Sequence, residues 1–578
     1  MTTADRAPAL QADRPRAWLP IAGLVFLAVA ASISGLLNQF AQDDFPIIWK
    51  NGAVHDLVHS YRFFAQPYWP KPFTPDLYRP LAVISYAVQW AIGGGSPLLF
   101  RVVSYLLYAI SSVMVFRLAR LVLPFACAFV AAALFAVHPV HVEAVAMAVN
   151  QGELWVAIIC CFAVERYVRI RRAGGPLGTR FELGLAGVYL FACFFKENAL
   201  VLPGLLLAAE LLLIPGGEPL KARVARGRRL FLLLALVAVA FFGVRTLVLS
   251  GDVVGTFTAE GLAYLTMGQR ALTMLAVVPH WFRLLLWPEH LQADYSPGEI
   301  VGQTSWGAEQ TLGAMLLLAT LLVLGATWRK RPAIAFGLVW MAVALFPVHN
   351  VLVPTGIVLA ERTLFLPSVG AMLALGGLAE ILLERAGATQ QLVLAGVVGA
   401  LLILGVARST TRHPVWADQF GLWYDTANRD APKSYRAHHA LAEMYFLAGA
   451  EGRAEREYRV AIQYAPATVG QVYLDYANKL RLRGFCFPAD ELYRKSLKVH
   501  PNNMAARASL VACLMHNGEY REALAESRLG ISYDWQRSTW QWLRDKADSA
   551  LRFGVPPGSI NIQVTDSVQT YMNIGTKR

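Results

Sequence analysis

Long apolar stretches recur along this chain as far as residue 407 and then stop. A helix needs ~20 mostly apolar residues to cross the ~30 Å hydrocarbon core of a bilayer. Of the 578 residues, 56% are hydrophobic and 16% are charged, which is more apolar side chain than a soluble core can bury. The sequence therefore predicts an all-α fold with a polytopic helical membrane domain of about eleven spans, at 17–37, 97–120, 124–138, 151–168, 182–195, 198–214, 229–249, 311–327, 333–348, 364–383 and 391–407.

Basic residues near the ends of these stretches indicate their orientation. If the predicted spans alternate in direction, the basic clusters all fall on one side, and the positive-inside rule makes that side cytoplasmic. The net charge of +13 is thus largely an orientation signal, and clusters this dispersed do not indicate nucleic-acid binding. The clusters are Arg14 with Arg16, Arg117 with Arg120, Arg166 to Arg172, Lys221 to Arg229, and Arg329 to Arg331.

This orientation divides the chain into a transmembrane domain, 17–407, and an outer C-terminal part. A cytoplasmic tail at 1–16 precedes an uncleaved signal anchor, because no small-residue cleavage site follows an apolar run there. The loops 38–96 and 250–310 face outward, and loops of this length in a compact protein usually carry function. We expect interfacial helices within them, at 81–92 and 270–287.

The segment 408–553 contains a repeat. Ala454, Ala489 and Ala523 are 35 and 34 residues apart, which is the period of tetratricopeptide helix pairs. Small residues let paired helices approach while aromatic residues fill the gaps, so we expect an α-solenoid here. Such an array either binds a protein partner or the acceptor on its concave face, or caps the membrane domain. A polar C-terminal tail, 554–578, either docks on the solenoid or is disordered.

The six cysteines give no metal-binding spacing. Four lie in predicted spans, where small buried cysteines usually belong to the core. Cys486 and Cys513 lie in adjacent repeats on the predicted outer side, and the sequence leaves open whether they form a disulfide.

Two adjacent carboxylates, Asp43 and Asp44, follow the first predicted span on the outer side. A carboxylate at the bilayer surface with an acidic neighbour can have a raised pKa and act as a general base toward a hydroxyl. Helix capping or surface solvation explains the pair equally well on position alone. The rest of the chain must therefore decide between these readings.

Five short motifs follow one another along the chain before the repeats. They are Asp43-Asp44 with Asn51, Tyr78-Arg79-Pro80-Leu81, His138-Pro139-Val140-His141-Val142-Glu143, Phe195-Lys196-Glu197-Asn198, and Ala360-Glu361-Arg362-Thr363. In this order, and with the repeats after them, they closely resemble the transmembrane and tetratricopeptide-repeat O-mannosyltransferases. The resemblance covers nearly the whole chain and implies the C-type glycosyltransferase fold.

The resemblance implies transfer of mannose or a similar sugar from a polyprenyl-phosphate donor to an acceptor hydroxyl at the outer membrane face. By the resemblance, Asp43 would be the base, and Asp44 would position the acceptor or stabilise the site. The lipid phosphate that leaves requires cations near the carboxylates. The candidates for binding the donor phosphate and sugar, with their acidic neighbours, are Arg79, His138, His141, Glu143, Lys196, Glu197, Arg245, Glu361 and Arg362.

Alternatives remain for several of these residues. His138 and His141 beside Glu143 could bind a metal or make structural hydrogen bonds, but donor contacts are favoured, and the sequence requires no divalent metal. Ion pairs such as Lys196 with Glu197, or Glu361 with Arg362, could equally be interfacial anchors. The acceptor is a protein or a glycolipid.

Two other functions compete with the enzyme. A lipid or polysaccharide transporter explains the spans, but its ionisable residues would lie at mid-span rather than at outer ends. A non-catalytic scaffold for envelope assembly explains the repeats but leaves the aspartate pair unused. Frequent Ala, Leu and Arg and short inner loops favour a bacterial inner membrane, with the repeats in the periplasm.

Overall fold

The computed structural model describes residues 18–71, 73, 76–174, 177–214, 219–251, 258–533, 537–562 and 564. These residues form helices and connecting loops: 74% of the described residues are helical, and none of them forms a strand. The expected cytoplasmic tail, 1–16, and the last part of the expected C-terminal tail, 565–578, lie outside the described residues.

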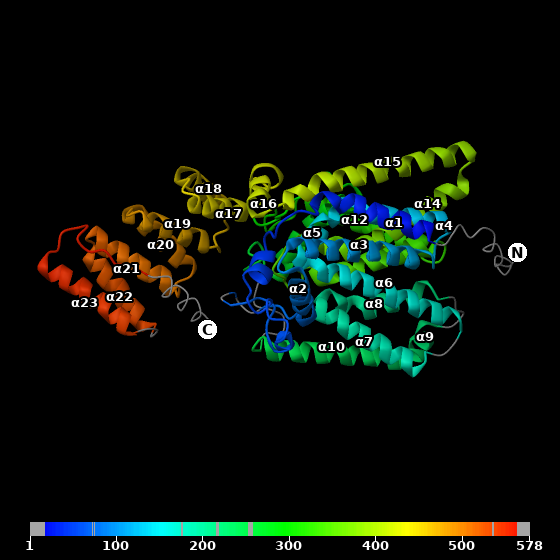
Figure 1. Cartoon of the computed structure of the whole chain (residues 1–578), viewed down its shortest axis with the longest axis horizontal. Helices are drawn as coiled ribbons and strands as arrows, with labels where there is room; N and C mark the ends of the chain where they lie inside the picture. Colours follow the sequence, from blue (N-terminus) through cyan, green and yellow to red (C-terminus); the bar gives the residue numbers. More distant parts are fainter. Residues whose placement is uncertain are drawn as a thin grey trace.

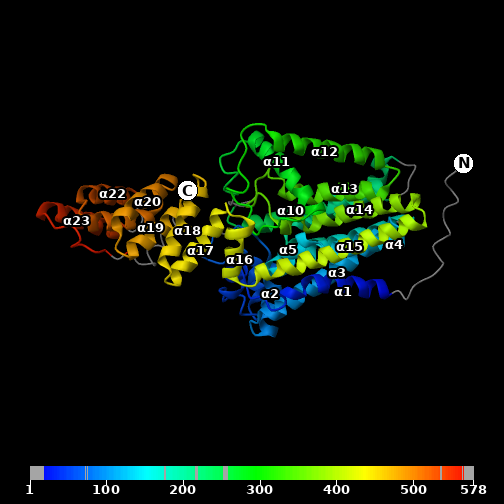
Figure 2. The same ribbon diagram turned by 90° about the horizontal axis from the view of Figure 1, so that it is seen from above.

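The first part of the chain is a bundle whose long helices run along the long axis of the molecule (Figures 1 and 2). Its helices are α1 (Leu19–Ser32), α2 (Pro80–Gly93), α3 (Pro97–Ala119), α4 (Phe125–Ala136), α5 (Val142–Ala146), α6 (Gln151–Arg172), α7 (Thr179–Phe195), α8 (Leu202–Leu212), α9 (Leu220–Arg226), α10 (Arg228–Val248), α11 (Met267–Leu286), α12 (Ala308–Thr327), α13 (Pro332–Leu345), α14 (Phe365–Arg385) and α15 (Ala388–Arg412).

Six helical stretches in the described part are long and apolar enough to cross a membrane. They are Pro97–Ala119, Ala148–Arg172, Arg228–Val248, Ala308–Thr327, Glu361–Arg385 and Ala388–Trp416. A seventh forms if α4 and the bent segment Pro139–Ala146 count as one broken span. Apolar helices such as α1 and α13 are shorter, and α8 has only 11 residues. The predicted count of eleven spans is therefore not confirmed, because apolar composition alone does not fix helix length.

Close backbone contact joins α13 to α14 inside the bundle. A Cβ atom added at Gly337 would overlap the carbonyl oxygen of Gly370, and one added at Gly370 would overlap that of Gly337. Two glycines facing each other thus let the helix backbones touch, as small residues do at helix interfaces in membranes.

The two predicted outer loops, 38–96 and 250–310, gather at the end of the bundle away from the start of α1 (Figure 1). Loop 38–96 contains a π-helical turn, η2 (Phe45–Trp49), a 3₁₀ segment, η3 (Ser60–Ala65), and α2. Its buried residues, among them Phe40, Ile48 and Tyr86, form one apolar cluster with Val142 and Trp416. This cluster ties the loop to the bundle. Loop 250–310 contains α11, a helix that the sequence predicts at 270–287.

The C-terminal part is a row of helical hairpins beyond the outer loops, which we call the hairpin domain (435–553). After α16 (Gln419–Asp425) come the pairs α17 (Tyr435–Leu447) with α18 (Glu451–Tyr464), α19 (Gln471–Leu482) with α20 (Cys486–Val499), and α21 (Met504–Asn517) with α22 (Tyr520–Ser532), followed by α23 (Arg537–Phe553).

The three hairpins share one sequence register. Each turn contains a glycine in the left-handed region, with φ of +73°, +80° and +83° at Gly449, Gly484 and Gly518. Glycine adopts this region at no steric cost and so ends the first helix of each pair. Ala454, Ala489 and Ala523 are buried at equivalent points of the second helices. The spacing seen in the sequence thus corresponds to a structural period of one hairpin.

Two further features of this domain are its pair of cysteines and the C-terminal tail. Cys486 and Cys513 are buried thiols between α20 and α21, with their sulfur atoms 2.8 Å apart. The described part of the tail docks on the last hairpin, where the Tyr520 hydroxyl donates to the Val555 carbonyl at 3.0 Å and Gly558 N–H donates to the His516 carbonyl at 2.7 Å.

A candidate active site at the outer end of the bundle

The chain turns sharply just before the aspartate pair. Gln42 has φ of +49°, in the left-handed region that few residues other than glycine adopt. Its backbone N–H donates to the Gln419 side-chain oxygen at 2.5 Å, so the first residue of α16 holds the turn. The turn leads into η2, so that Asp43 and Asp44 lie at its entrance in different surroundings.

Asp43 lines a cavity of about 470 Å³ between the bundle and the outer loops. The cavity contains four of the residues that the resemblance implies for the donor, namely Arg79, Lys196, Glu197 and Arg362. They come from the starts of α2 and α14 and from the link between α7 and α8. Three motifs far apart in sequence therefore meet beside one carboxylate.

Arg79 is held in the cavity wall by Glu197. Its Nε and Nη2 donate to the two carboxylate oxygens of Glu197 at 2.9 and 2.5 Å, and its guanidinium lies 5.0 Å from the centre of the Tyr68 ring. Burial raises the pKa of the Glu197 carboxyl, but the Arg79 charge and hydrogen bonds outweigh burial and lower the pKa to about 2. This bidentate pair remains ionised at neutral pH and fixes a cation at the site.

Lys196 is held by a different carboxylate. Its Nζ donates to Glu153 Oε1 at 2.7 Å, and Asn198 Nδ2 donates to the other oxygen of Glu153 at 2.9 Å. Burial lowers the pKa of Lys196, and the Glu153 charge opposes that shift. Both Glu153 and Asn198 line the cavity with Lys196, so the three residues form one polar cluster on its wall.

Arg362 completes the wall. It lies in a short 3₁₀ segment, Glu361–Leu364, that leads directly into α14. Its backbone N–H donates to Glu143 Oε2 at 2.8 Å, and its guanidinium pairs with Glu143 Oε1. Glu143 is 1% exposed and comes from α5. The pair of Glu143 with Arg362 therefore connects the motif that ends at Glu143 to the motif that contains Arg362. The guanidinium has five N–H groups, and those that Glu143 does not use remain for a ligand.

The Asp43 carboxyl has the electrostatics expected of a base. Burial raises its pKa above the usual aspartate range, and the Arg362 charge partly offsets this, while Asp44 and Glu143 add to the rise. A raised pKa brings proton affinity closer to working pH, which favours proton abstraction.

Asp44 faces away from the cavity. Its carboxylate is fully buried, pairs with Arg101 at 3.3 Å and accepts the backbone N–H groups of Ala148 and Val149 at 3.3 and 3.0 Å. These contacts connect the first outer loop to α3 and to the start of α6. Of the two roles implied for Asp44, the contacts fit stabilising the site, since this carboxylate is 0% exposed and does not line the cavity.

Five predicted donor-site residues lie behind the cavity wall rather than on it, and one of them is Glu143, which pairs with Arg362. His138 Nε2 donates to the Leu285 carbonyl at 3.0 Å, and His141 contacts the hydroxyls of Tyr108 and Ser368 at 3.0 and 2.8 Å. The other two are Arg245, which donates to the Asp76 carbonyl at 2.9 Å, and Glu361, which accepts from Gln292 N–H at 2.5 Å and the Tyr295 hydroxyl at 3.0 Å.

Sequence reasoning missed several residues of the site. Glu153 and Arg101 lie near the starts of α6 and α3, beside apolar residues of predicted spans, and an ionisable residue in a span is a signal that could have found them. Glu260, Asp294 and Arg436 also line the cavity. Nothing local distinguishes Arg436 from the other arginines of the repeats.

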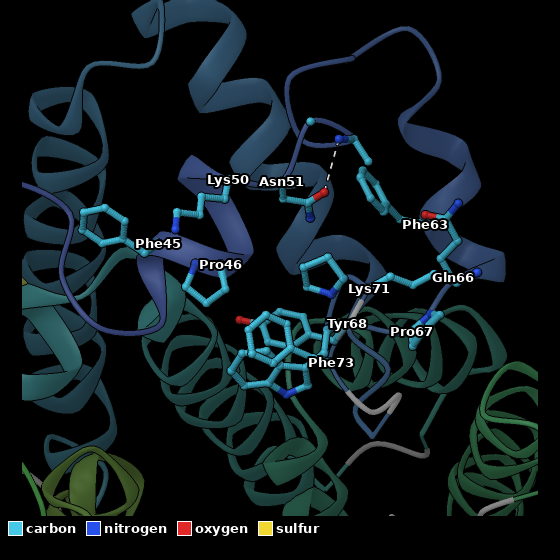
Figure 3. Close-up of a pocket in the computed structure, with 14 residues that line it drawn as sticks. Phe45, Pro46, Lys50, Asn51, Phe63, Gln66, Pro67, Tyr68, Lys71 and Phe73 are labelled. Carbon is cyan, nitrogen blue, oxygen red and sulfur yellow. Dashed lines mark hydrogen bonds between the residues drawn. The ribbon is translucent and has the colours of Figure 1, made fainter. Parts of the chain in front are cut away.

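A second hollow of about 770 Å³ opens within loop 38–96 (Figure 3). Its wall is aromatic and proline-rich, with Phe45, Phe63 and Phe73 around it, and Lys50 and Lys71 at its edge. Tyr68 and Trp69 line both this outer hollow and the cavity of Asp43. The two spaces are therefore neighbours across these two rings.

Among the described residues, one group of three His, Cys, Asp or Glu side chains has ligand atoms within 4.8 Å of one another. It consists of His439, Glu443 and Asp475 and lies in the hairpin domain, where Lys479 Nζ pairs with Glu443 at 2.9 Å. A lysine at that distance already neutralises the carboxylate that a metal ion would need.

Known proteins that are similar to this chain indicate its family. No family model matches the chain. The chain is 26% identical to protein O-mannosyl-transferase TMTC3 of Mus musculus over 373 residues, covering 60% of this chain and 40% of that protein. It is 25% identical to Tmtc1 of Drosophila melanogaster over 550 residues, covering 77% and 61%. Drosophila Tmtc2 is 30% identical over 298 residues, covering 48% and 30%.

The matched region thus spans about two fifths to three fifths of the first two relatives' own lengths. All of these relatives are named protein O-mannosyl-transferases, which agrees with the family that the motifs resemble. The curated homologues of this chain are therefore protein O-mannosyl-transferases of the TMTC family, and the resemblance is confirmed.

Proposed function

We propose that this chain is an integral-membrane glycosyltransferase that moves mannose or a similar sugar from a polyprenyl-phosphate donor to a protein hydroxyl. The observation that supports this most is the cavity in which Asp43 lies with Arg79, Lys196 and Arg362. A base for the hydroxyl and cations for a leaving phosphate are the two requirements of this reaction. The names of the relatives supply the choice of mannose and of a protein acceptor.

In the proposed reaction the Asp43 carboxylate takes the proton of the acceptor hydroxyl. The hydroxyl oxygen then attacks the anomeric carbon of the donor sugar, and the bond from that carbon to the phosphate oxygen breaks. The electron pair of this bond leaves with the polyprenyl phosphate, whose added charge the guanidinium of Arg362 and the ammonium of Lys196 stabilise. No other reactant is needed for the balance.

The cavity wall constrains how the donor binds. Its described lining residues include six carboxylates, Asp43, Asp76, Glu153, Glu197, Glu260 and Asp294, and four cations, Arg79, Lys196, Arg362 and Arg436. Because the acids outnumber the bases, the donor phosphate must use N–H groups that the glutamates leave free. Arginine suits this role, since one guanidinium can serve a glutamate and a phosphate together.

The wider arrangement belongs to the same proposal. We propose that the shorter apolar helices also cross the membrane, completing eleven spans, and that the hairpin domain is a tetratricopeptide-repeat solenoid on the outer, periplasmic face. The acceptor would approach through the outer hollow, whose aromatic rings and prolines suit an extended polypeptide (Figure 3). The solenoid would hold the rest of the acceptor protein.

Purified protein in nanodiscs tests the reaction directly. With polyprenyl-phosphate mannose and an envelope-protein extract, we expect mannose on serine or threonine, detected by mass spectrometry, and none with Asp43→Asn. Comparing envelope glycoproteins and glycolipids of cells with and without the gene identifies the natural sugar and acceptor. If no glycan differs between these cells and no transfer occurs in nanodiscs, the proposal is wrong.

Donor binding has its own test. Lys196→Ala should weaken binding of polyprenyl-phosphate mannose by about tenfold, because a charge-assisted contact contributes more than a neutral hydrogen bond. Arg331→Ala is the matched control, since Arg331 pairs with Glu384 at 2.6 Å and does not line the cavity. Equal affinities for both variants would remove Lys196 from the donor site.

A further inference from the structure

One charged side chain of the cavity comes from outside the membrane domain. Arg436, the second residue of α17, lines the cavity with Asp43, Lys196 and Arg362. Among the described residues, the others that line the cavity all lie between Gln42 and Thr363. The hairpin domain therefore reaches into the space where the candidate base lies.

Loop 250–310 holds this arginine in place. Arg436 Nη2 lies 3.0 Å from Glu260 Oε2, and Nη1 lies 3.7 Å from Asp294 Oδ1. Both carboxylates line the cavity themselves. The guanidinium is thus held between two acids at the cavity rim and is not a freely moving surface group.

The first turn of α17 is also docked through its backbone and cap. Ser434 caps the helix by accepting Ala437 N–H at 3.1 Å, and its hydroxyl donates to Asp294 Oδ2 at 2.6 Å. Lys433 N–H donates to Glu299 Oε1 at 2.8 Å. The place of Arg436 in the cavity consequently depends on the docking of the hairpin domain on loop 250–310.

The Arg436 charge acts on the candidate base. Burial is the main effect on the pKa of Asp43 and raises it, whereas the charges of Arg362 and Arg436 lower it. Asp43 acts on Arg436 in return, because it helps to raise the pKa of that guanidinium. The charged and titratable groups that surround Asp43 are Asp44, Glu143, Arg362 and Arg436, and, on the cavity wall, Tyr68, Asp76, Arg79, Glu153, Lys196, Glu197, Glu260, Asp294 and Tyr295.

We propose that Arg436 is a positioning residue of the active site: the docked hairpin domain supplies a cation to the wall of the cavity in which the Asp43 carboxylate accepts the acceptor proton. This rests on the proposed function, in which Asp43 takes the acceptor proton. The membrane domain without the docked domain has a base that protonates more readily. Docking of the hairpin domain, which is proposed to hold the acceptor, thus affects proton transfer to Asp43 in the membrane domain.

The pH profile of kcat/KM tests this with the full-length chain. In Arg436→Ala the acidic limb should move to higher pH, and the rate at a pH on that limb should fall about tenfold for each unit of movement. Arg436→Lys keeps the charge and should restore the limb. Arg459→Ala is the control, because Arg459 lies on α18 of the same domain and pairs with Glu455 away from the cavity.

A second variant separates charge from loss of docking. Glu260→Gln removes a negative charge from the cavity wall while Arg436 remains, so its acidic limb should move to lower pH. A loosened domain would instead disturb both variants in the same direction, which would overturn the proposal.

The outcomes also separate this inference from the proposed function. If the unchanged protein transfers sugar and Asp43→Asn does not, while Arg436→Ala retains the normal profile, only the role of Arg436 is wrong. If Asp43→Asn is fully active, the base is wrong and this inference falls with it.

Discussion

Adjacent carboxylates have separate tasks in this protein. Asp43 faces the cavity and the charges of Arg362 and Arg436, while Asp44 is enclosed with Arg101 and two backbone N–H groups. The left-handed turn at Gln42 directs them to these two environments. Substitutions at the two positions should therefore affect different properties.

Asp43→Asn should fold and insert normally, because amide and carboxylate have nearly the same shape, yet lose ~10²–10⁴ of the transfer rate. In the unchanged protein the rate should rise with pH as Asp43 deprotonates. Because burial raises this pKa, the rise should lie above the usual aspartate range near pH ~3.9. Transfer assays from pH 4 to 8 measure both effects, and full activity of the amide variant would exclude Asp43 as the base.

Asp44→Asn should act on stability first. It leaves Arg101 as a buried charge without its carboxylate, which costs about 3–5 kcal/mol in buried pairs. Thermal unfolding in detergent measures the loss. Glu491→Gln provides the contrast, because the pair of Glu491 with Lys495 is exposed and water screens its charges, so its loss should leave the melting temperature nearly unchanged. Equal melting temperatures for the two variants would contradict the structural role of Asp44.

At the scale of elements, glycines decide how closely helices approach. Gly337 and Gly370 bring α13 and α14 into backbone contact, whereas Gly399 on α15 has nothing near its Cβ position. In the hairpin domain the turn glycines serve a different purpose, since their positive φ values end a helix. The same residue type thus has two physical roles in the two parts of the chain.

Gly370→Ala should destabilise the bundle by about 1–3 kcal/mol, because the added methyl group overlaps the Gly337 carbonyl and forces the helices apart. Gly399→Ala should be neutral or slightly stabilising, since alanine favours a helix over glycine by about 1 kcal/mol. Melting temperatures of both variants in one detergent test this. A stable Gly370→Ala protein would show that the two helices separate at little cost.

For the whole molecule, the candidate site depends on how the bundle and the hairpin domain are joined. The predicted outer loops lie between them, at the end of the bundle away from the start of α1 (Figure 1). Contacts such as Arg436 with Glu260 connect the first hairpin to loop 250–310. Deleting the hairpin domain would therefore remove part of the cavity as well as the proposed acceptor surface.

A reporter enzyme fused after Arg578 that works only outside the cytoplasm should be active, because the basic clusters mark the opposite face as cytoplasmic. A second fusion within the basic segment near Arg329 should be inactive and is the control. Activity of the second fusion alone would invert the topology and place Asp43 on the cytoplasmic side.

Much of the architecture follows from local sequence. Apolar stretches predicted the six long helices, and the predicted repeat of Ala454, Ala489 and Ala523 has the same period as the hairpins. The count of eleven spans is not confirmed, because breaks such as the bend after α4 divide one apolar stretch into short helices. Helix length depends on local turns and on packing, and hydropathy does not record either.

The sequence by itself determined a helical membrane bundle followed by regular helical hairpins, since composition and period act through neighbouring residues. Motif order also identified Asp43, Arg79, Lys196, Glu197 and Arg362, which the structure places on one cavity. Only the tertiary structure separated Asp44 from Asp43, turned His138 and His141 away from the cavity, and brought in Arg436, 393 positions after Asp43. Those outcomes depend on which side chains burial and charge pairing bring together across distant helices, and no local pattern carries that information.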